Sequence, residues 1–502
     1  MRTTRLLHSM LAKLLAGTAA LLAILLISGH ARPGHVRPGH DFRPDVARPN
    51  RPNVVLIFMD DLGYGDLSCY GALGYRTPNL DRLAAEGTRF TNFLVAQPVC
   101  SASRAALLTG CYPNRLGISG ALNPTALVGL HPEEETIAEL LKEQGYRTGI
   151  FGKWHLGHRQ PFLPLQQGFD EYLGIPYSND MWPQHPNQAN LKFPPLPLIE
   201  GNQPVKTLAS LTDQDSLTTA LTERAVSFVR RNRRNPFFLY LPFPMPHVPL
   251  AVSGKHRNSS GAGLYADVIT EVDWAVGQIL ASLKQTGVEK NTLVIFTSDN
   301  GPWLAYGEHA GSSGGLREGK QTTFEGGNRV PCIVRWPGEV PAGQVSNQLL
   351  STLDVLPTVA RLCGARLPRR PIDGIDVQAA WRGTATESPR QTFLYYFREN
   401  NLEAVRKGDW KLVLAHPGVS YEAGKPGRDG KPGQTPGNHA FEGALYDLRH
   451  DPGERYDRQA MHPDVVSDLQ QLAEQARADL GDNLQQRPGS NRRAPGTVAK
   501  AD

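Results

Sequence analysis

The sequence predicts an α/β protein with a large, mainly parallel central sheet flanked by helices, followed by a smaller α+β domain. Two observations carry this prediction. Apolar runs alternate with helical patterns over most of the chain, and near residue 385 the pattern changes to short strands joined by turns. With 502 residues, of which 40% are hydrophobic and 20% charged, the chain is long enough for more than one domain.

Order is expected to begin at residue 53, where the apolar run NVVLIFM ends in charge and glycine, as a buried parallel strand does. Similar runs recur at residues 147–154, 236–243, 292–301 and 330–338. Four helical patterns lie among them: NLDRLAAEG, TIAELLKEQG, SLTTALTERAVSFVRRN and LYADVITEVDWAVGQILASLKQTG. This alternation predicts one α/β domain over residues 53–384.

The region from residue 385 to 485 predicts a smaller α+β domain. TFLYYF, LEAVRKGDWKLVLA and ALYDLRHDPGE are typical of short antiparallel strands, and DVVSDLQQLAEQARADLGD of a closing helix. Residues 486–502 are rich in polar residues and are expected to form a disordered tail.

The N-terminal segment predicts export. Arg2, Arg5 and Lys13 precede an apolar run at residues 14–29, which is typical of a cleaved signal peptide over residues 1–30. A retained membrane anchor is the alternative, because the run is close to the shortest length that spans a bilayer. Residues 31–52 repeat Arg-Pro and Gly-His and are expected to be a disordered linker. We therefore expect a periplasmic or secreted protein with no stable membrane insertion after cleavage.

The charge pattern argues against a nucleic-acid partner, because the net charge is only +5 and the basic residues are scattered. The chain has five cysteines, an odd number for an exported protein, so at least one is left free or chemically altered. Cys100, which precedes the apolar run AALL, is the one that needs an explanation.

Two acidic pairs follow predicted strands. Asp60 and Asp61 end the first strand, and Asp299 and Asn300 end the strand that begins at residue 292. Ligands bind outside the carboxyl ends of parallel strands, and all four side chains offer oxygen donors. This pattern indicates a hard-cation site for Ca²⁺ or Mg²⁺. Zinc is disfavoured because no Cys or His lies beside either pair in the sequence.

Cationic and titratable side chains are expected at the same edge of the sheet: Arg104, Lys153, His155, His247 and Lys320. Together with a divalent cation, they suit an anionic tetrahedral ester, because cations neutralise its oxygens and a histidine protonates the leaving oxygen. Phosphate, phosphonate and sulfate esters all meet this description.

Several segments resemble the sulfatase family. CSASRAALLTG (residues 100–110) resembles its first signature and GYRTGIFGKWHLG (residues 145–157) its second. MDDLGYGD, GIPYSND, PHVPL, SDNG and GKQTTFEGGNRVP are similar to further family segments, in the family's order. Within the family, the resemblance is to the arylsulfatase A and N-acetylgalactosamine-6-sulfatase group, and it implies an alkaline-phosphatase-like fold.

The resemblance implies that a separate maturation enzyme oxidises Cys100 to Cα-formylglycine, whose hydrate is the nucleophile. One hydroxyl attacks sulfur and releases the alcohol, and the second hydroxyl then expels sulfate. The family resemblance also implies that the cation is Ca²⁺ rather than Mg²⁺, and that its ligands are Asp60, Asp61, Asp299, Asn300 and the modified Cys100.

The resemblance also implies a role for each remaining residue. Arg104 would support the formylglycine. Lys153 and Lys320 would bind sulfate oxygens, His247 would act as general acid, and His155 would take a proton from the hydrate. A substrate contact is implied for Ser178 as well.

One position departs from the commoner family form. Residue 102 is Ala where that form has Pro, so conversion of Cys100 depends on the maturation system of the host.

Two rival functions stay open from the sequence. One is a formylglycine-dependent phosphonate or phosphodiester hydrolase, and the other is a catalytically silent protein that binds sulfated glycans. The substrate is expected to be an aryl sulfate or a sulfated sugar. Tyr177, Met181 and Trp182 are candidates for stacking on its ring.

Overall fold

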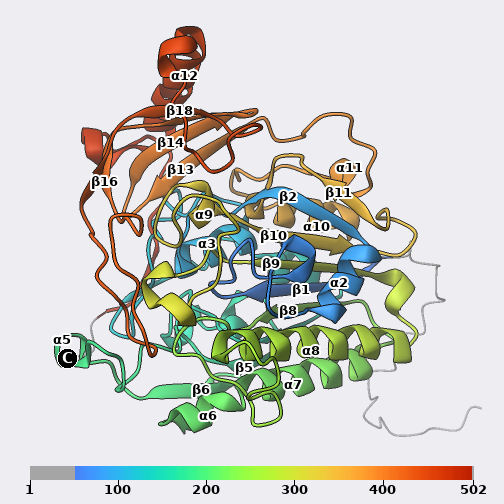
Figure 1. Cartoon of the computed structure of the whole chain (residues 1–502). Helices are drawn as coiled ribbons and strands as arrows, with labels where there is room; N and C mark the ends of the chain where they lie inside the picture. The colour runs from blue at the N-terminus through green and yellow to red at the C-terminus, as the bar shows by residue number, and fades with distance from the viewer. Residues whose placement is uncertain (1–50, 500–502) are drawn as a thin grey trace, which may run out of the picture. The chain divides into compact units, whose positions relative to one another are not determined.

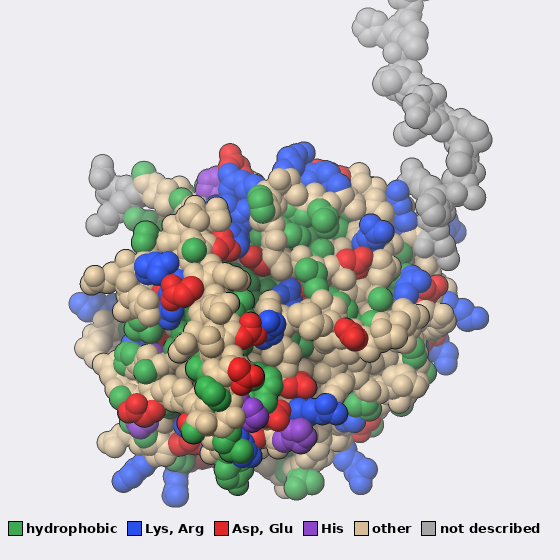
Figure 2. All heavy atoms as spheres, turned by 90° about the horizontal axis from the view of Figure 1, so that it is seen from above, with side chains coloured by type: hydrophobic (Ala, Val, Ile, Leu, Met, Phe, Trp, Pro, Cys, Tyr) green, Lys and Arg blue, Asp and Glu red, His purple; other side chains and the backbone are tan. Residues whose placement is uncertain are grey.

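The computed structural model describes residues 51–499. The predicted signal peptide and all but the last two residues of the predicted linker lie outside the described residues. Among helices of the described part, none combines the length and apolar character needed to cross a membrane. On the face drawn in Figure 2, acidic and basic side chains are interspersed.

An eleven-stranded mixed sheet forms the centre of the fold (Figure 1). Its order is β11-β2-β10-β9-β1-β8-β4-β5-β6-β7, with β12 also paired to β2. The bounds are β1 (Asn53–Met59), β2 (Thr88–Leu94), β4 (Arg147–Phe151), β5 (Glu171–Gly174), β6 (Leu196–Glu200), β7 (Gln203–Leu208), β8 (Phe237–Pro242), β9 (Thr292–Ser298), β10 (Arg329–Arg335), β11 (Gln344–Ser346) and β12 (Leu350–Ser351).

The middle of this sheet is parallel. β9, β1, β8, β4 and β5 run in one direction, whereas β10 is antiparallel to both of its neighbours. The five predicted apolar runs correspond to β1, β4, β8, β9 and β10, so the predicted fold class is confirmed.

Helices cover both faces of the sheet. Successive side chains of β1 point to opposite faces and are buried in two different cores. Val54, Leu56 and Phe58 belong to the core on one face, and Val55 and Ile57 to the core on the other. The first core includes residues of α3 (Cys100–Thr109), α4 (Ile137–Glu143) and α10 (Val355–Leu362); the second includes residues of α2 (Pro78–Ala85), α7 (Leu217–Asn232) and α8 (Leu264–Gln285).

The C-terminal region forms the predicted smaller antiparallel sheet. Its order is β13-β14-β15-β18, with helix α12 packed on β14 and β15. The bounds are β13 (Thr392–Phe397), β14 (Asn401–Lys407), β15 (Trp410–Val413), β18 (Ala444–Asp447) and α12 (Pro463–Leu480). A third core joins this sheet to α3 through residues such as Ala106 and Tyr395.

The remaining elements are short. They comprise β3 (Val128–Gly129), β16 (His416–Gly418), β17 (His439–Phe441), β19 (Gly496–Thr497), α5 (Gln188–Leu191), α6 (Leu211–Asp215), α9 (Glu325–Asn328), α11 (Gln378–Trp381), and the 3₁₀ helices η1 (Ser68–Tyr70), η2 (Gln160–Phe162), η3 (Pro164–Gln167), η4 (Glu289–Asn291), η5 (Leu304–His309), η6 (Thr352–Asp354), η7 (Gln459–Met461) and η8 (Asn483–Gln485).

The prediction of a disordered tail from residue 486 is wrong for residues 486–499. β19 pairs with β3, and the backbone N–H of Arg493 donates to the carbonyl of Arg115 at 2.6 Å. Arg493 also pairs with the buried Glu134 at 3.0 Å. Polar composition indicated disorder, but distant partners supply the hydrogen bonds and charges that order this segment.

Candidate active site

The two acidic pairs meet because their strands are adjacent and parallel. In the register of β1 and β9, Met59 lies opposite Ser298, so the residues that follow leave the sheet side by side. The backbone N–H of Asp61 donates to Oδ1 of Asp299 at 3.1 Å. Asp61 has φ +63°, which turns the chain sharply after β1. The predicted edge of the sheet therefore carries both pairs.

Asn300 completes the acidic pairs and leaves one oxygen free. Its Nδ2 donates to Oδ1 of Asp61 at 2.7 Å and to the carbonyl of Gly301 at 2.9 Å. Its Oδ1 is buried and has no hydrogen-bond partner within residues 51–499. The next residue, Gly301, packs closely against another part of the backbone. A Cβ at this position would lie 1.8 Å from the carbonyl oxygen of Gly326, so only glycine fits. A bound cation would satisfy the free amide oxygen.

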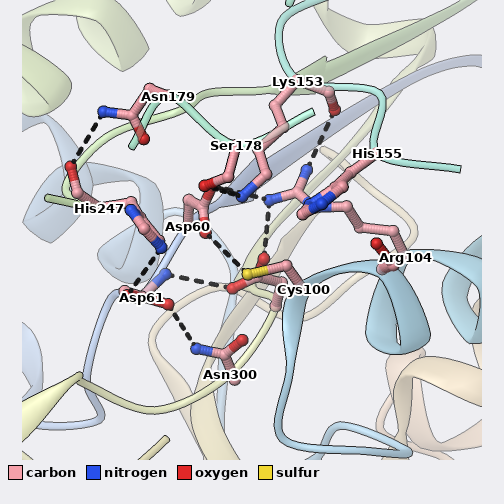
Figure 3. A network of polar contacts seen from close by, with 12 residues as sticks. Asp60, Asp61, Cys100, Arg104, Lys153, His155, Ser178, Asn179, His247 and Asn300 are labelled. Atoms are coloured by element: carbon pink, nitrogen blue, oxygen red, sulfur yellow. Dashed lines mark hydrogen bonds and ion pairs between the residues drawn. The ribbon is translucent and has the colours of Figure 1, made fainter. Parts of the chain in front are cut away.

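Cys100 begins helix α3 and faces the same carboxylates (Figure 3). Its Sγ lies 3.7 Å from Oδ1 of Asp60, and its side chain is buried. Burial raises the pKa of the Cys100 thiol to about 12, although the charges of Lys153 and Lys320 oppose the shift. The thiol is therefore protonated at neutral pH and poorly suited to act as a thiolate nucleophile.

All five cysteines lie within residues 51–499 and have free thiols, so Cys100 forms no disulfide with Cys111. Ala102, the position that departs from the commoner family form, is buried against Val99 and Phe397. Its backbone N–H donates to the carbonyl of Gly120 at 3.2 Å, a bond that proline cannot make.

Arg104 lies one helical turn after Cys100 and is fully buried. Its Nη2 contacts Oδ2 of Asp299 at 2.7 Å and Oδ2 of Asp60 at 3.3 Å, and its Nη1 donates to the carbonyl of Lys153 at 3.2 Å. The guanidinium therefore ties helix α3 to the ends of β1, β9 and β4.

The loop after β4 supplies Lys153 and His155. Nζ of Lys153 lies 2.5 Å from Oδ2 of Asp60 and donates to Oγ of Ser178 at 3.0 Å. The ring of His155 contacts the carbonyl of Leu122 through Nε2 at 2.9 Å, and its buried Nδ1 has no partner in the described part of the chain. Burial, and next the charge of Lys153, lower the pKa of His155 well below its usual value.

His247 and Lys320 both contact Asp61. Nε2 of His247 lies 3.5 Å from Oδ2 of Asp61, and Nζ of Lys320 lies 2.7 Å from its Oδ1. Burial lowers the pKa of His247, and Asp61 partly offsets this effect. Burial also opposes the charged form of Lys320, but Asp61 holds the pKa of that ammonium well above its usual value.

The carboxylates differ strongly in their affinity for protons. Burial alone would raise the pKa of Asp60, but Lys153, His247 and Arg104 hold it well below its usual value. Burial, and next the charge of Asp60, raise the pKa of Asp299. This repulsion between crowded carboxylates is what a divalent cation relieves.

The residues fit a hard divalent cation. Ligand atoms of Asp60, Asp61, Cys100 and His247 all lie within 4.8 Å of one another. Asp299 and Asn300 border the same group. Carboxylate and amide oxygens dominate this set, which matches Ca²⁺ better than zinc. The structure nevertheless brings Cys100 and His247 beside Asp61, although neither is near it in sequence.

The structure brings every predicted site residue into one cluster: Asp60, Asp61, Cys100, Arg104, Lys153, His155, Ser178, His247, Asp299, Asn300 and Lys320. Trp303 is a neighbour that the sequence analysis missed. Nζ of Lys320 lies 4.4 Å from the centre of its ring, and the ring of His247 lies 5.5 Å from it. Its place three residues after Asn300 was the available signal.

Comparison with known proteins agrees with this geometry. The sulfatase family model matches residues 52–365, and the model of the C-terminal region of aryl-sulfatase matches residues 388–495. A third model, the C-terminal region of N-sulphoglucosamine sulphohydrolase, matches residues 318–414.

Two similar relatives cover most of both chains. Human arylsulfatase A is 41% identical over 458 residues, which are 85% of this chain and 87% of the relative. Rat N-acetylgalactosamine-6-sulfatase is 40% identical over 435 residues, which are 81% of each chain.

Among solved structures, the PsFucS1 sulfatase from Pseudoalteromonas sp. superposes with a TM-score of 0.77 at 30% identity. The alignment covers 88% of this chain and 92% of that one. With relatives of this similarity and a family model that spans residues 52–365, the chain belongs to the sulfatase family.

Proposed function

We propose that this sulfatase hydrolyses sulfate monoesters with a formylglycine made from Cys100 and a Ca²⁺ ion. The observation that carries the proposal is the position of Cys100. It is buried at the start of α3, 3.7 Å from a carboxylate of a site that suits a hard cation, and its raised pKa makes the unmodified thiol a poor nucleophile. Oxidation to an aldehyde hydrate would place a hydroxyl there instead.

We assign the cation to Asp60, Asp61, Asp299, Asn300 and the modified Cys100. The free Oδ1 of Asn300 and the crowding of the carboxylates support this assignment. When bound, the ion would lower the pKa of the attacking hydroxyl and neutralise a sulfate oxygen.

Three cationic side chains would help to neutralise the negative charge of the sulfate group or hold the modified residue. Lys153 contacts Asp60 and Lys320 contacts Asp61, and each ammonium would bind a sulfate oxygen. Ser178 shares a hydrogen bond with Lys153 and would orient that ammonium toward the substrate. Arg104, held by Asp60 and Asp299, would keep the modified residue in place.

The two histidines suit opposite proton transfers. A carbonyl can only accept, so Nε2 of His155 donates to Leu122 and its free Nδ1 can take a proton. His155 would therefore act as base on the hydrate. Nδ1 of His247 donates to the carbonyl of Val248 at 2.5 Å, which leaves Nε2 directed at the centre. A proton on Nε2 would be given to the leaving oxygen, as a general acid does.

We also propose a partner and a cellular location for this protein. The modification requires a formylglycine-generating maturation enzyme, and the N-terminal segment predicts export to the periplasm or the medium.

The test combines mass and activity. The chain is produced with a formylglycine-generating enzyme, and the peptide that contains Cys100 is weighed, because formylglycine is lighter than cysteine. Hydrolysis of an aryl sulfate is then measured before and after chelation. We expect the lighter mass, loss of activity on chelation with recovery on adding Ca²⁺, and a loss of about 10⁴-fold or more in Cys100→Ala.

Cys111→Ala is the matched control, since it removes a buried thiol outside the site. An unmodified Cys100 in a fully active enzyme would contradict the mechanism. A preference of several orders of magnitude for an aryl phosphodiester would instead support the rival hydrolase.

A further inference from the structure

A pocket of about 560 Å³ lies beside His247, within the range of small-molecule sites. Its lining includes Asp180, Trp182, Val248, Pro249, Tyr306 and Lys431. These residues come from four separate segments: the loop after β5, the loop after β8, the helix η5, and an insertion of the C-terminal region.

The pocket adjoins the reaction centre on the side of the general acid. Val248 directly follows His247, and the ring of Tyr306 packs edge-on against Trp303 at 4.9 Å. Trp303 in turn contacts both His247 and Lys320. Because His247 would protonate the leaving oxygen, the alcohol part of the ester would extend into this pocket.

Asp180 is the feature that points to the chemistry of that alcohol. The residue is only 8% exposed, and its Oδ1 has no hydrogen-bond partner among residues 51–499. The other oxygen, Oδ2, lies 3.8 Å from Nε2 of His185. A buried carboxylate oxygen without a donor is costly, so a ligand that brings a hydroxyl or amide N–H to it is favoured.

The remaining walls are mostly apolar. Trp182, Val248 and Leu250 are buried and give the pocket an apolar lining, whereas Asp429 and Lys431 are exposed. The insertion that carries the last two is held in place by Gly427 and Gly433, whose backbone N–H groups both donate to the carbonyl of Ala305 at 2.8 Å.

We propose that this pocket binds the sugar ring of a sulfated glycan, with a free hydroxyl or amide N–H of that ring donating to Asp180. A pyranose has apolar C–H faces and hydroxyl groups at its edge. The faces match the apolar side chains of the pocket, and the hydroxyls match the carboxylate of Asp180. A simple aryl ring has no donor and would leave Asp180 unpaired. This inference rests on the proposed function and adds the substrate class to it.

The test compares two primary alkyl sulfates with the same type of leaving oxygen. Methyl glucopyranoside 6-sulfate carries ring hydroxyls, and cyclohexylmethyl sulfate does not. The measured quantity is the ratio of their kcat/KM values in the matured enzyme and in Asp180→Ala. We expect the ratio to fall about 10- to 100-fold in the variant, because only the sugar loses a hydrogen bond to a charged group. Asp180→Asn keeps an acceptor oxygen and is expected to give a smaller fall.

A second measurement does not depend on turnover. Unsulfated methyl glucopyranoside is used as a competitive inhibitor, and its inhibition constant is expected to rise in Asp180→Ala by the same factor as the ratio falls. Asp464→Ala, which removes an exposed carboxylate on α12, is the matched control.

A ratio that stays within about threefold in both Asp180 variants overturns the assignment, since Asp180 would then act on both esters alike. Failure of the proposed function is distinguishable: in that case the unmutated enzyme hydrolyses neither alkyl sulfate nor an aryl sulfate.

Discussion

His155 and His247 each have one ring nitrogen bound to a backbone carbonyl, and that bond decides which nitrogen faces the centre. His155 uses Nε2 for the carbonyl of Leu122, and His247 uses Nδ1 for the carbonyl of Val248. The two rings therefore present opposite nitrogens, Nδ1 and Nε2, to the chemistry. Burial lowers the pKa of both rings, which leaves Nδ1 of His155 free to accept a proton. His247 must bind a proton at Nε2, where the carboxylate of Asp61 favours the charged ring, before it can act as an acid.

The role of His247 predicts a dependence on the leaving group. In His247→Gln, kcat/KM for an alkyl sulfate should fall about 10²- to 10⁴-fold, because an alkoxide needs a proton to leave. The fall should be much smaller for 4-nitrophenyl sulfate, whose phenolate leaves readily without one. Steady-state kinetics on the two esters measure the difference.

His450→Gln is the control, because His450 is exposed and pairs with Asp447 at the surface. An equal fall on both esters in His247→Gln would show that His247 orders the site rather than donating a proton.

The loop that carries Lys320 is held by the C-terminal sheet region. Its Glu318 accepts from Oγ of Ser420 at 2.7 Å and from the backbone N–H of Tyr421 at 2.6 Å. The hydroxyl of Tyr421 donates to the carbonyl of Lys320 itself, also at 2.7 Å. Contacts between two elements of the chain thus set the position of one ammonium in the active site.

Glu403 on β14 lies at this junction and predicts a pH-dependent stability. Its Oε2 accepts from Oγ1 of Thr323 at 2.8 Å and lies 3.3 Å from Nε2 of His416. Burial raises the pKa of Glu403 to about 8, from an ordinary value of 4.5, and the Thr323 bond opposes the shift. Below about pH 4.5 both the folded and unfolded chains hold this proton. As the pH rises toward about 8, the unfolded chain loses it first, so Glu403 destabilises the fold progressively.

Glu403→Gln removes this titration while keeping the shape of the side chain. Its free energy of unfolding relative to the unmutated protein should rise between pH 5 and pH 8.5 by an amount on the order of 3 kcal/mol. Chemical denaturation across that range measures the trend. Glu399→Gln, at an exposed position beside the same strand, is the control for the substitution itself. A difference for Glu403→Gln that does not change with pH would contradict the prediction.

At the scale of the whole molecule, the chain end returns to the catalytic domain. β19 pairs with β3, and Arg493 reaches three partners: Glu134 at 3.0 Å, the carbonyl of Pro371 at 3.2 Å and Sγ of Cys111 at 3.0 Å. These partners lie more than a hundred residues from Arg493 in sequence. This segment therefore contacts three parts of the chain that are distant from it in sequence.

This closure predicts that Arg493→Ala destabilises the protein by about 1–3 kcal/mol, because the buried Glu134 loses one of its cationic partners. Its neighbour Arg492 makes one long bond, at 3.4 Å to the carbonyl of Asn114, so Arg492→Ala should change stability by less than about 0.5 kcal/mol. Denaturant unfolding compares the two variants. A loss in Arg493→Ala as small as that expected for Arg492→Ala would contradict the prediction.

Local signals determined much of the fold in advance. The apolar runs that became β1, β4, β8 and β9 indicated strands buried on both faces, and the acidic pairs after β1 and β9 indicated the edge that binds ligands. The run at residues 330–338 looked the same, yet β10 is antiparallel. An apolar run reports burial and carries no information about strand direction.

The sequence by itself thus determined the fold class, the residue types of the site and their family resemblance, because periodicity and short motifs are local properties. Only the tertiary structure decided what depends on distant partners. It brought Cys100 and His247 to the same carboxylate group and ordered the tail through Arg493. It also left Oδ1 of Asp180 without a hydrogen-bond partner among residues 51–499, beside a pocket lined by several separate segments. Hydrogen bonds and ion pairs between residues far apart in sequence leave no local pattern to detect.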